Sequence, residues 1–256
     1  PGIWDIDTRS LTKKLRIHGV MMGALEVSSE TVDIEALRKE LDSSKTYGEI
    51  NFVDQVSLRN PKDYLNPGPR VVLVDCGVKN GILRDLLKRG LHVIRVPYDT
   101  PADEILSYKP SGVVVSNGPG DPKLCISTVK TVGELLCKDM RLLGICLGNQ
   151  ILALAEGGDT FKLKYGHRGQ NKPCVDLKTG RSYVTSQNHG YAVAPESLKD
   201  TGLEVWFINA DDKTVEGLRH KSKPCFAVQF HPEASPGPYD TEYVFDTFDS
   251  MVRKAS

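Results

Sequence analysis

The pattern of apolar positions changes near residue 70. Beyond it, short apolar runs alternate with segments whose apolar residues have helical spacing. The predicted strands span 71–75, 92–96, 112–115 and 141–145, and the predicted helices span 80–89, 102–108 and 127–137. Strands and helices that alternate in this way predict a parallel sheet with helices on both faces. The unbroken apolar run Val113–Val115 is typical of a strand that is covered on both sides.

After a further helical pattern that follows residue 146, the chain becomes rich in predicted strands. These strands span 161–164, 181–187, 204–209, 214–220 and 225–230. A last helix is predicted at 241–253, where Val244, Phe245, Phe248 and Met251 recur at core-facing spacing. We therefore expect an α/β fold with a mixed, mostly parallel open sheet that is flanked by helices.

The first 69 residues have a different pattern. A helix is predicted to begin after Asp7 or Thr8 and to end at His18-Gly19, because these residues are typical of helix ends. A strand is predicted at 22–27 and a helix at 31–41. Residues 45–68 are rich in Asn, Pro and Gly, which favours a linker along a domain surface.

Composition excludes several classes of protein. The 256 residues carry 33 basic and 33 acidic side chains, so no basic surface suggests nucleic acid as a partner. No apolar run approaches the length of a membrane span, and no signal peptide is visible. The six cysteines are scattered without C-x-x-C pairs, which argues against a disulfide framework or a zinc site. We expect a cytoplasmic protein with reduced thiols, no metal site and no membrane partner.

One stretch carries the strongest signal for chemistry. The apolar run Leu142–Ile145 ends at Cys146, which lies between Gly144 and Gly148 and is followed at once by a helical pattern. This order of strand, sharp turn and helix is typical of a nucleophile elbow. A helix N-terminus beside the sulfur favours the reactive thiolate. The alternative is that Cys146 is a small buried apolar residue.

A second stretch supplies the partners that a cysteine nucleophile needs. His231 follows the apolar run 225–230, and Glu233 lies two residues further on. Residues at this spacing in an extended segment point the same way, so Glu233 can orient the imidazole of His231. We predict a Cys146–His231–Glu233 triad. Taken alone, the His-Pro-Glu run could equally be a capped loop before a helix.

With these residues in view, the chain resembles the class I (triad) glutamine amidotransferases. The segments G-I-C-L-G-N-Q and Q-F-H-P-E match the two signatures of that family. The segments S-N-G-P-G-D-P, S-Q-N-H-G-Y-A-V and P-E-A-S-P-G-P narrow the resemblance to the small subunits of carbamoyl phosphate synthetase. One departure is Asn149, where the family usually has histidine.

The resemblance implies roles for further residues. Leu147, which follows the nucleophile, is expected to donate its backbone N–H to an oxyanion, and Gly118 is expected to supply the second donor. The residues expected to bind the substrate glutamine are Gln150, Gln187, Asn188, Gly190, Tyr191 and Gly120. His189 is expected to steady the pocket without acting as a second base.

The resemblance also implies a function. We expect the chain to hydrolyse L-glutamine through a cysteinyl thioester and to supply ammonia, through a channel, to a synthetase large subunit or fused synthetase domain. That activity belongs to arginine and pyrimidine biosynthesis. No phosphate loop is present in the sequence, so no cofactor is expected on this chain; ATP and magnesium are expected on the partner. Two alternatives remain open: a subunit that serves another synthase, and a non-catalytic regulatory domain.

The expected domains follow from the same resemblance. Residues 1–30 are predicted to be the C-terminal part of a small N-terminal domain, the rest of which would precede Pro1. Residues 31–69 are predicted to form an interdomain helix and linker. Residues 70–256 are predicted to form the glutamine amidotransferase domain.

Overall fold

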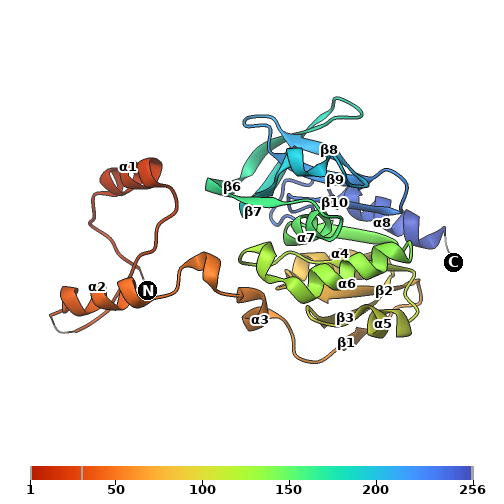
Figure 1. The fold of residues 1–256 in the computed structure, drawn as a ribbon, viewed down its shortest axis with the longest axis horizontal. Helices are drawn as coiled ribbons and strands as arrows, with labels where there is room; N and C mark the ends of the chain where they lie inside the picture. The colour runs from red at the N-terminus through yellow and green to blue at the C-terminus, as the bar shows by residue number, and fades with distance from the viewer. Residues whose placement is uncertain (1, 30, 255–256) are drawn as a thin grey trace.

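The computed structural model describes residues 2–29 and 31–254 (Figure 1). The strands in these residues are β1 (Lys62–Tyr64), β2 (Arg70–Asp75), β3 (His92–Pro97), β4 (Gly112–Val115), β5 (Leu142–Ile145), β6 (Thr160–Asp176), β7 (Ser182–Val193), β8 (Leu203–Asn209), β9 (Val215–His220) and β10 (Cys225–Val228). They form one sheet in the order β1-β3-β2-β4-β5-β10-β9-β8-β6-β7. Strands β3, β2, β4, β5 and β10 are parallel, and antiparallel pairs extend the sheet at both ends.

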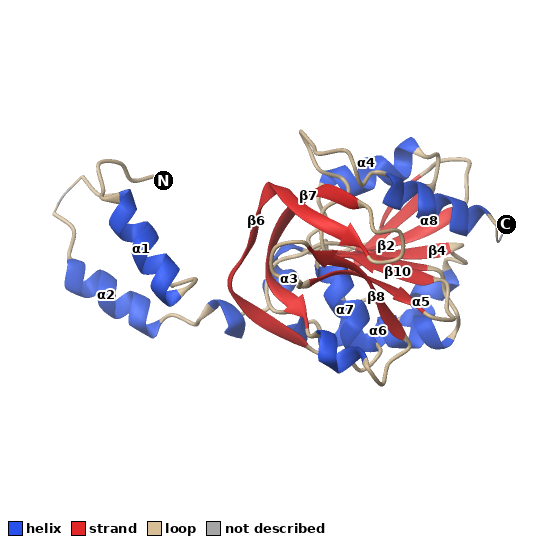
Figure 2. Ribbon diagram, turned by 90° about the horizontal axis from the view of Figure 1, so that it is seen from above, coloured by secondary structure: helices blue, strands red, loops and turns tan. Residues whose placement is uncertain are grey.

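Helices cover both faces of the parallel strands (Figure 2). They are α4 (Asn80–Lys88), α5 (Ala102–Ser107), α6 (Ile126–Cys137), α7 (Leu147–Ala155) and α8 (Tyr243–Arg253). The strand residues alternate between two cores: Val113 and Val115 pack with α5, α6 and α7, whereas Val114 packs with α4 and α8. The expected α/β fold is confirmed, and its parallel centre is buried on both sides as the apolar runs predict.

The antiparallel part of the sheet differs most from the prediction. The strands expected at 161–164 and 181–187 are the ends of a much longer ribbon formed by β6 and β7. The ribbon contains register shifts between Lys162 and His167 and between Gly169 and Lys172. Its exposed residues include Lys162, Lys164, Gln170 and Asn171, which break any apolar alternation, so cross-strand pairing rather than side-chain pattern defines it.

The first part of the N-terminal segment lies to one side of the sheet and touches β6, whereas Val53, near its end, packs into the core (Figures 1 and 2). It contains α1 (Thr8–His18), α2 (Ile34–Ser43), the short turn η1 (Tyr47–Glu49) and α3 (Phe52–Val56). The caps predicted for α1 are confirmed, since the side chain of Asp7 accepts from the Ser10 N–H at 2.8 Å. The strand predicted at 22–27 is wrong: these residues have no partner strand to satisfy their backbone groups.

Strand β1 arises from the segment predicted as a linker and pairs with β3. The three domain boundaries stay a prediction. Two short 3₁₀ turns, η2 (Pro122–Leu124) and η3 (Pro195–Leu198), complete the elements. Among the residues that the structure describes, none of the helices has the length and apolar character needed to cross a membrane.

Two glycines allow β5, β4 and α7 to approach closely at the end of β5. A Cβ atom on Gly148 would lie 2.2 Å from the carbonyl oxygen of Val115, and one on Gly144 would lie 2.5 Å from the carbonyl oxygen of Gly148. Both distances are far below van der Waals contact. Neither position can take a side chain unless the helix moves away from the sheet.

We therefore expect Gly148→Ala to lower the free energy of unfolding by about 1–3 kcal/mol or more, because the added methyl group overpacks a rigid backbone contact. Urea unfolding followed by circular dichroism measures this. Gly133→Ala is the matched control, since its Cβ would meet the Ala155 carbonyl oxygen at an ordinary 3.6 Å. A helix-interior alanine there should be neutral or stabilise by up to about 1 kcal/mol. Equal effects of the two substitutions would contradict the packing argument.

Candidate active site

Cys146 lies between the end of β5 and the first residue of α7. Its backbone has φ 55° and ψ −100°, a conformation that a non-glycine residue rarely adopts. The Cys146 N–H donates to the Val228 carbonyl at 2.8 Å, which ties the turn to the end of β10. The structure thus contains the predicted sharp turn, with backbone strain at the residue proposed to react.

His231 reaches the same edge of the sheet from β10. Because β10 runs parallel to β5, with Val228 opposite Ile145, the two chain segments leave the sheet side by side. The His231 N–H donates to the Ser186 carbonyl on β7 at 2.9 Å. Cys146 and His231 both line one cavity. Two residues that are 85 positions apart in the printed sequence therefore share one site.

Glu233 orients the imidazole as predicted. Its Oε1 atom lies 2.7 Å from His231 Nδ1, and both side chains are 2% exposed. A carboxylate accepts the hydrogen bond, so Nδ1 carries a proton and Nε2 is the nitrogen that can exchange a proton with the thiol.

The charges of His231 and Glu233 stabilise one another. Burial by itself would lower the pKa of His231, but the neighbouring Cys146 and the Glu233 carboxylate together raise it to about 9. Burial would raise the pKa of Glu233, but the charge and hydrogen bond of His231 hold it below its ordinary value. The imidazole is thus held in its charged form at neutral pH.

Lys79 is a neighbour of the triad that the sequence analysis did not single out. Its Nζ atom lies 3.8 Å from Glu233 Oε1 and 3.4 Å from His231 Nδ1. Since Nδ1 already donates to Glu233 at 2.7 Å, Lys79 interacts with the carboxylate rather than with the ring. Its positive charge helps to lower the pKa of Glu233.

The predicted oxyanion donors lie on two adjoining segments. Leu147 is the first residue of α7, where backbone N–H groups have no partner within the helix. Gly118 packs against this residue: a Cβ on Gly118 would lie 2.7 Å from Leu147 Cδ2 and 2.2 Å from the Cys76 carbonyl oxygen. The side chain of Asn117 accepts from the Lys79 N–H at 3.0 Å and holds the Gly118 loop in place.

The cavity that contains the triad has a volume of about 280 Å³. Five of the six predicted substrate-binding residues line it: Gly120, Gln150, Asn188, Gly190 and Tyr191. The Gln150 side chain donates from Nε2 to the Tyr191 carbonyl at 2.8 Å, which connects α7 to β7 across the cavity. The Asn188 carbonyl lies 4.0 Å from Cys146 Sγ.

Gln187 is the exception among the predicted substrate-binding residues. Its side chain is buried and bonds to Cys174 Sγ, Thr185 Oγ1 and His189 Nε2, and it does not line the cavity. A direct contact of the Gln187 side chain with substrate stays a prediction, and the present arrangement places this side chain outside the cavity lining. The bonds of Gln187 to Cys174 and Thr185 hold its side chain outside the cavity, whereas the four residues that follow it line the cavity.

Several cavity residues were not predicted to bind substrate: Tyr47, Lys79, Asn117, Pro119, Arg168 and His189. Tyr47 comes from the segment predicted as a linker, and its hydroxyl accepts from the Gly120 N–H at 3.0 Å. No signal in the sequence connects these two residues, which are 73 positions apart. Asn149, the departure from the family pattern, is fully buried and donates to Gln229 Oε1 at 3.3 Å, away from the cavity.

Comparison with known proteins agrees with this geometry. Residues 72–251 match the family model described as "Glutamine amidotransferase class-I". The crystal structure of a Thermoplasma acidophilum protein, described as part of a putative GMP synthase, superposes with a TM-score of 0.61 and 24% identity, covering 73% of this chain and 96% of that one. At that identity the likeness shows the fold alone.

Curated relatives match nearly the whole chain. The carbamoyl phosphate synthase small chain of Methanopyrus kandleri is 54% identical over 99% of this chain and 71% of its own length. The small chains of Methanocaldococcus jannaschii and Pyrococcus furiosus are 53% and 49% identical, over 96% and 98% of this chain and 70% and 67% of their own lengths. With the triad geometry, these matches confirm the predicted family: the chain belongs to the class-I glutamine amidotransferases and, among them, to the carbamoyl phosphate synthase small chains.

Proposed function

We propose that this chain hydrolyses the side-chain amide of L-glutamine and supplies the ammonia to a carbamoyl phosphate synthase large subunit. The observation that carries the proposal is the buried Cys146–His231–Glu233 arrangement at the wall of a cavity, in a chain that is about half identical to carbamoyl phosphate synthase small chains.

The chemistry begins with attack by sulfur. The thiolate of Cys146 adds to the amide carbon, and the resulting tetrahedral intermediate collapses when His231 donates its proton to the departing ammonia. The product is a glutamyl thioester. Water then attacks the thioester while His231 accepts the water's proton, which releases glutamate and restores the thiolate–imidazolium pair.

Oxyanion stabilisation is assigned to the backbone N–H groups of Leu147 and Gly118. Loss of one such donor typically costs about 3 kcal/mol of transition-state stabilisation. The close packing of Gly118 against Leu147 supports the assignment, since it places the two segments side by side at the cavity that contains Cys146.

Glutamine recognition is assigned to the polar wall of the cavity. Gln150, Asn188, Gly190 and Tyr191 supply amide, carbonyl and backbone groups, and Arg168 adds a positive charge that suits the substrate carboxylate. A cavity of about 280 Å³ is of the size expected for one small-molecule ligand.

The rest of the reaction is assigned to the partner. We propose that ATP and magnesium act on the large subunit, or on a fused synthetase domain, and that this chain needs no cofactor. The ammonia would pass through a channel into carbamoyl phosphate for arginine and pyrimidine synthesis. A cytoplasmic location remains part of the proposal, supported by the scattered cysteines of the sequence.

Cys146→Ser should lower the rate of glutamine hydrolysis at least about 1,000-fold, because serine lacks an activated thiolate at this position. In the assembled complex, carbamoyl phosphate synthesis from free ammonia should persist. A coupled glutamate assay and an ammonia-dependent synthesis assay measure the two rates.

Cys137→Ser is the matched control, since Cys137 is exposed and lies at the end of α6. It should leave both rates unchanged. A glutamine-like chloroketone should label Cys146 in the unmodified chain. Glutamine hydrolysis that survives Cys146→Ser, or loss of both rates in a correctly assembled complex, would overturn the assignment.

The pH profile should report the charge of His231. The proton that His231 gives to ammonia is present below its pKa of about 9 and is lost as pH rises through that value, so kcat/KM should fall above pH 9. Glu233→Gln removes a negative charge that favours the imidazolium, and the fall should therefore begin at lower pH. Steady-state kinetics across the pH range measure both profiles.

Glu242→Gln is the control for this shift. Glu242 pairs with Lys88 at 3.0 Å and makes no contact with His231 among the interactions of the described residues. Its profile should match that of the unmodified chain. A Glu233→Gln profile that also matches would show that the carboxylate does not set the charge of the imidazole.

A further inference from the structure

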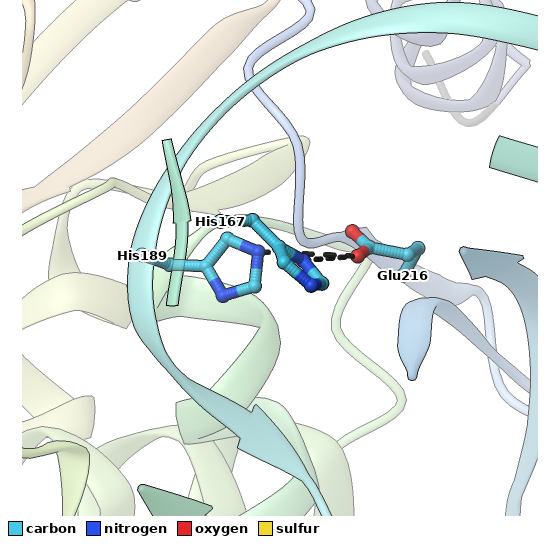
Figure 3. A group of neighbouring side chains, drawn as sticks. All are labelled: His167, His189 and Glu216. Atoms are coloured by element: carbon cyan, nitrogen blue, oxygen red, sulfur yellow. Dashed lines mark hydrogen bonds and ion pairs between the residues drawn. The ribbon is translucent and has the colours of Figure 1, made fainter. Parts of the chain in front are cut away.

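A second cluster of titratable side chains lies on β6, β7 and β9, and its member His189 also lines the cavity of Cys146. His167, His189 and Glu216 are buried, and one nitrogen or oxygen atom from each lies within 4.8 Å of the other two. Figure 3 shows both imidazoles turned toward the Glu216 carboxylate. Glu216 Oε1 lies 3.1 Å from His167 Nδ1 and 3.9 Å from His189 Nε2. The mechanism proposed above uses none of these groups as an acid, base or nucleophile.

The hydrogen bonds of His189 leave one ring nitrogen with a free lone pair. Its Nδ1 atom lies 2.8 Å from the Tyr191 carbonyl oxygen, which can only accept, so Nδ1 carries the proton. A neutral imidazole has a single N–H, so Nε2 presents a lone pair toward Glu216.

The amide of Gln187 presents a second lone pair to the same place. Thr185 Oγ1 donates to the Lys172 carbonyl at 2.7 Å and so can accept from Gln187 Nε2 at 3.1 Å. That orientation turns Gln187 Oε1 toward His189 Nε2, at 3.2 Å. Two acceptors face one another with no proton between them, which is unfavourable unless a positive charge lies nearby.

Glu216 adds a buried carboxyl group with one oxygen atom that has no partner among the described residues. It is fully buried, and its Oε2 atom has no hydrogen-bond partner among the residues that the structure describes. Its Oε1 atom faces His167 Nδ1 at 3.1 Å, while Asp212 Oδ2 accepts from His167 Nε2 at 2.8 Å. Like His189, His167 is thus hydrogen-bonded outward through one nitrogen and faces Glu216 with the other.

We propose that His167 Nδ1, His189 Nε2 and the Glu216 carboxylate bind one divalent transition-metal ion. Around a tetrahedral zinc ion with bonds of about 2.0–2.2 Å, ligand atoms are separated by about 3.3–3.6 Å. The separations of 3.1 and 3.9 Å from Glu216 Oε1 bracket that spacing. Gln187 Oε1 supplies a further oxygen beside His189. Binding displaces the proton between His167 Nδ1 and Glu216, which leaves to solvent.

The surroundings match those of known metal-binding histidines. Such a ligand usually donates its second N–H to a carbonyl or carboxylate, as His189 does to Tyr191 and His167 does to Asp212. Imidazole nitrogen with one carboxylate favours zinc, cobalt, nickel or iron over calcium or magnesium.

An entry route and a consequence both follow from the position of the site. A cavity of about 440 Å³, lined in part by His167, Asn209 and Asp212, reaches the cluster at His167, and its lining shares no residue with that of the Cys146 cavity. His167 and His189 are cross-strand partners on the β6–β7 ribbon, and Glu216 is on β9. A bound ion would fasten the ribbon to the sheet behind the wall that carries Asn188 and Gly190.

The test uses the full chain without an affinity tag, stripped with chelator, in a Cys146→Ser background so that the catalytic thiol cannot bind the ion. We expect one Zn²⁺ or Co²⁺ per chain by isothermal titration and elemental analysis, and visible Co²⁺ absorption bands of nitrogen and oxygen ligation. At zinc concentrations near 100 times Kd, the Tm should rise by about 5 to 10 °C.

Glu216→Gln and His167→Asn should each weaken Co²⁺ binding at least tenfold, with folding checked by circular dichroism. His92→Gln is the matched control, because His92 has the same pairing with a carboxylate, 2.6 Å from Asp63, but lies elsewhere on β3. It should bind as the parent does. Absence of stoichiometric binding by the parent, or Glu216→Gln binding that equals that of His92→Gln, would overturn the proposal. The glutaminase assignment does not depend on either result.

Discussion

The parallel pairing of β5 with β10 is the constraint on which the active site depends. Val228 lies opposite Ile145 in this pair, and the Cys146 N–H donates to the Val228 carbonyl at 2.8 Å. Since parallel strands end at the same edge of a sheet, the nucleophile and the imidazole leave the sheet together. The close backbone contacts at Gly144 and Gly148 then place the start of α7 directly beside the sulfur.

Burial by itself lowers the pKa of each of the three histidines in this region. The neighbouring groups decide whether the net shift of the pKa is upward or downward. His231 has Cys146 and Glu233 as partners, and its pKa is raised to about 9 despite burial. His189 has only uncharged hydrogen-bond partners, and burial lowers its pKa to about 3. Hydrogen bonds to Glu216 and Asp212 raise the pKa of His167, against the opposing effect of burial. Histidine thus has three different states here: His231 is a charged acid, His189 is a neutral ring with a free lone pair, and His167 is a ring paired with carboxylates.

The β6–β7 ribbon connects the two sites. The ribbon lines the cavity of Cys146 through Asn188, His189 and Gly190, and His189 also faces Glu216. Gln187 lies outside the cavity and bonds to Thr185. Adjacent residues of one motif, S-Q-N-H-G-Y, therefore differ in role: Asn188 lines the cavity, and Gln187 bonds to the residues behind it.

Local signals in the sequence determined the α/β class, most helices and strands, and the three triad residues. Apolar runs, helix caps and the G-x-C-x-G spacing are short-range features. They predict the structure correctly because the local preferences and the tertiary fold favour the same conformation. The length of the β6–β7 ribbon could not be predicted, since cross-strand pairing defines it. Tyr47 and Lys79 line the cavity from distant segments of the chain, and Gln187 does not line it. No local pattern in the sequence predicts either fact. No spacing in the sequence indicates the His167–His189–Glu216 cluster, because its side chains come from three strands. Only the folded sheet brings their nitrogen and oxygen atoms within 4.8 Å of one another.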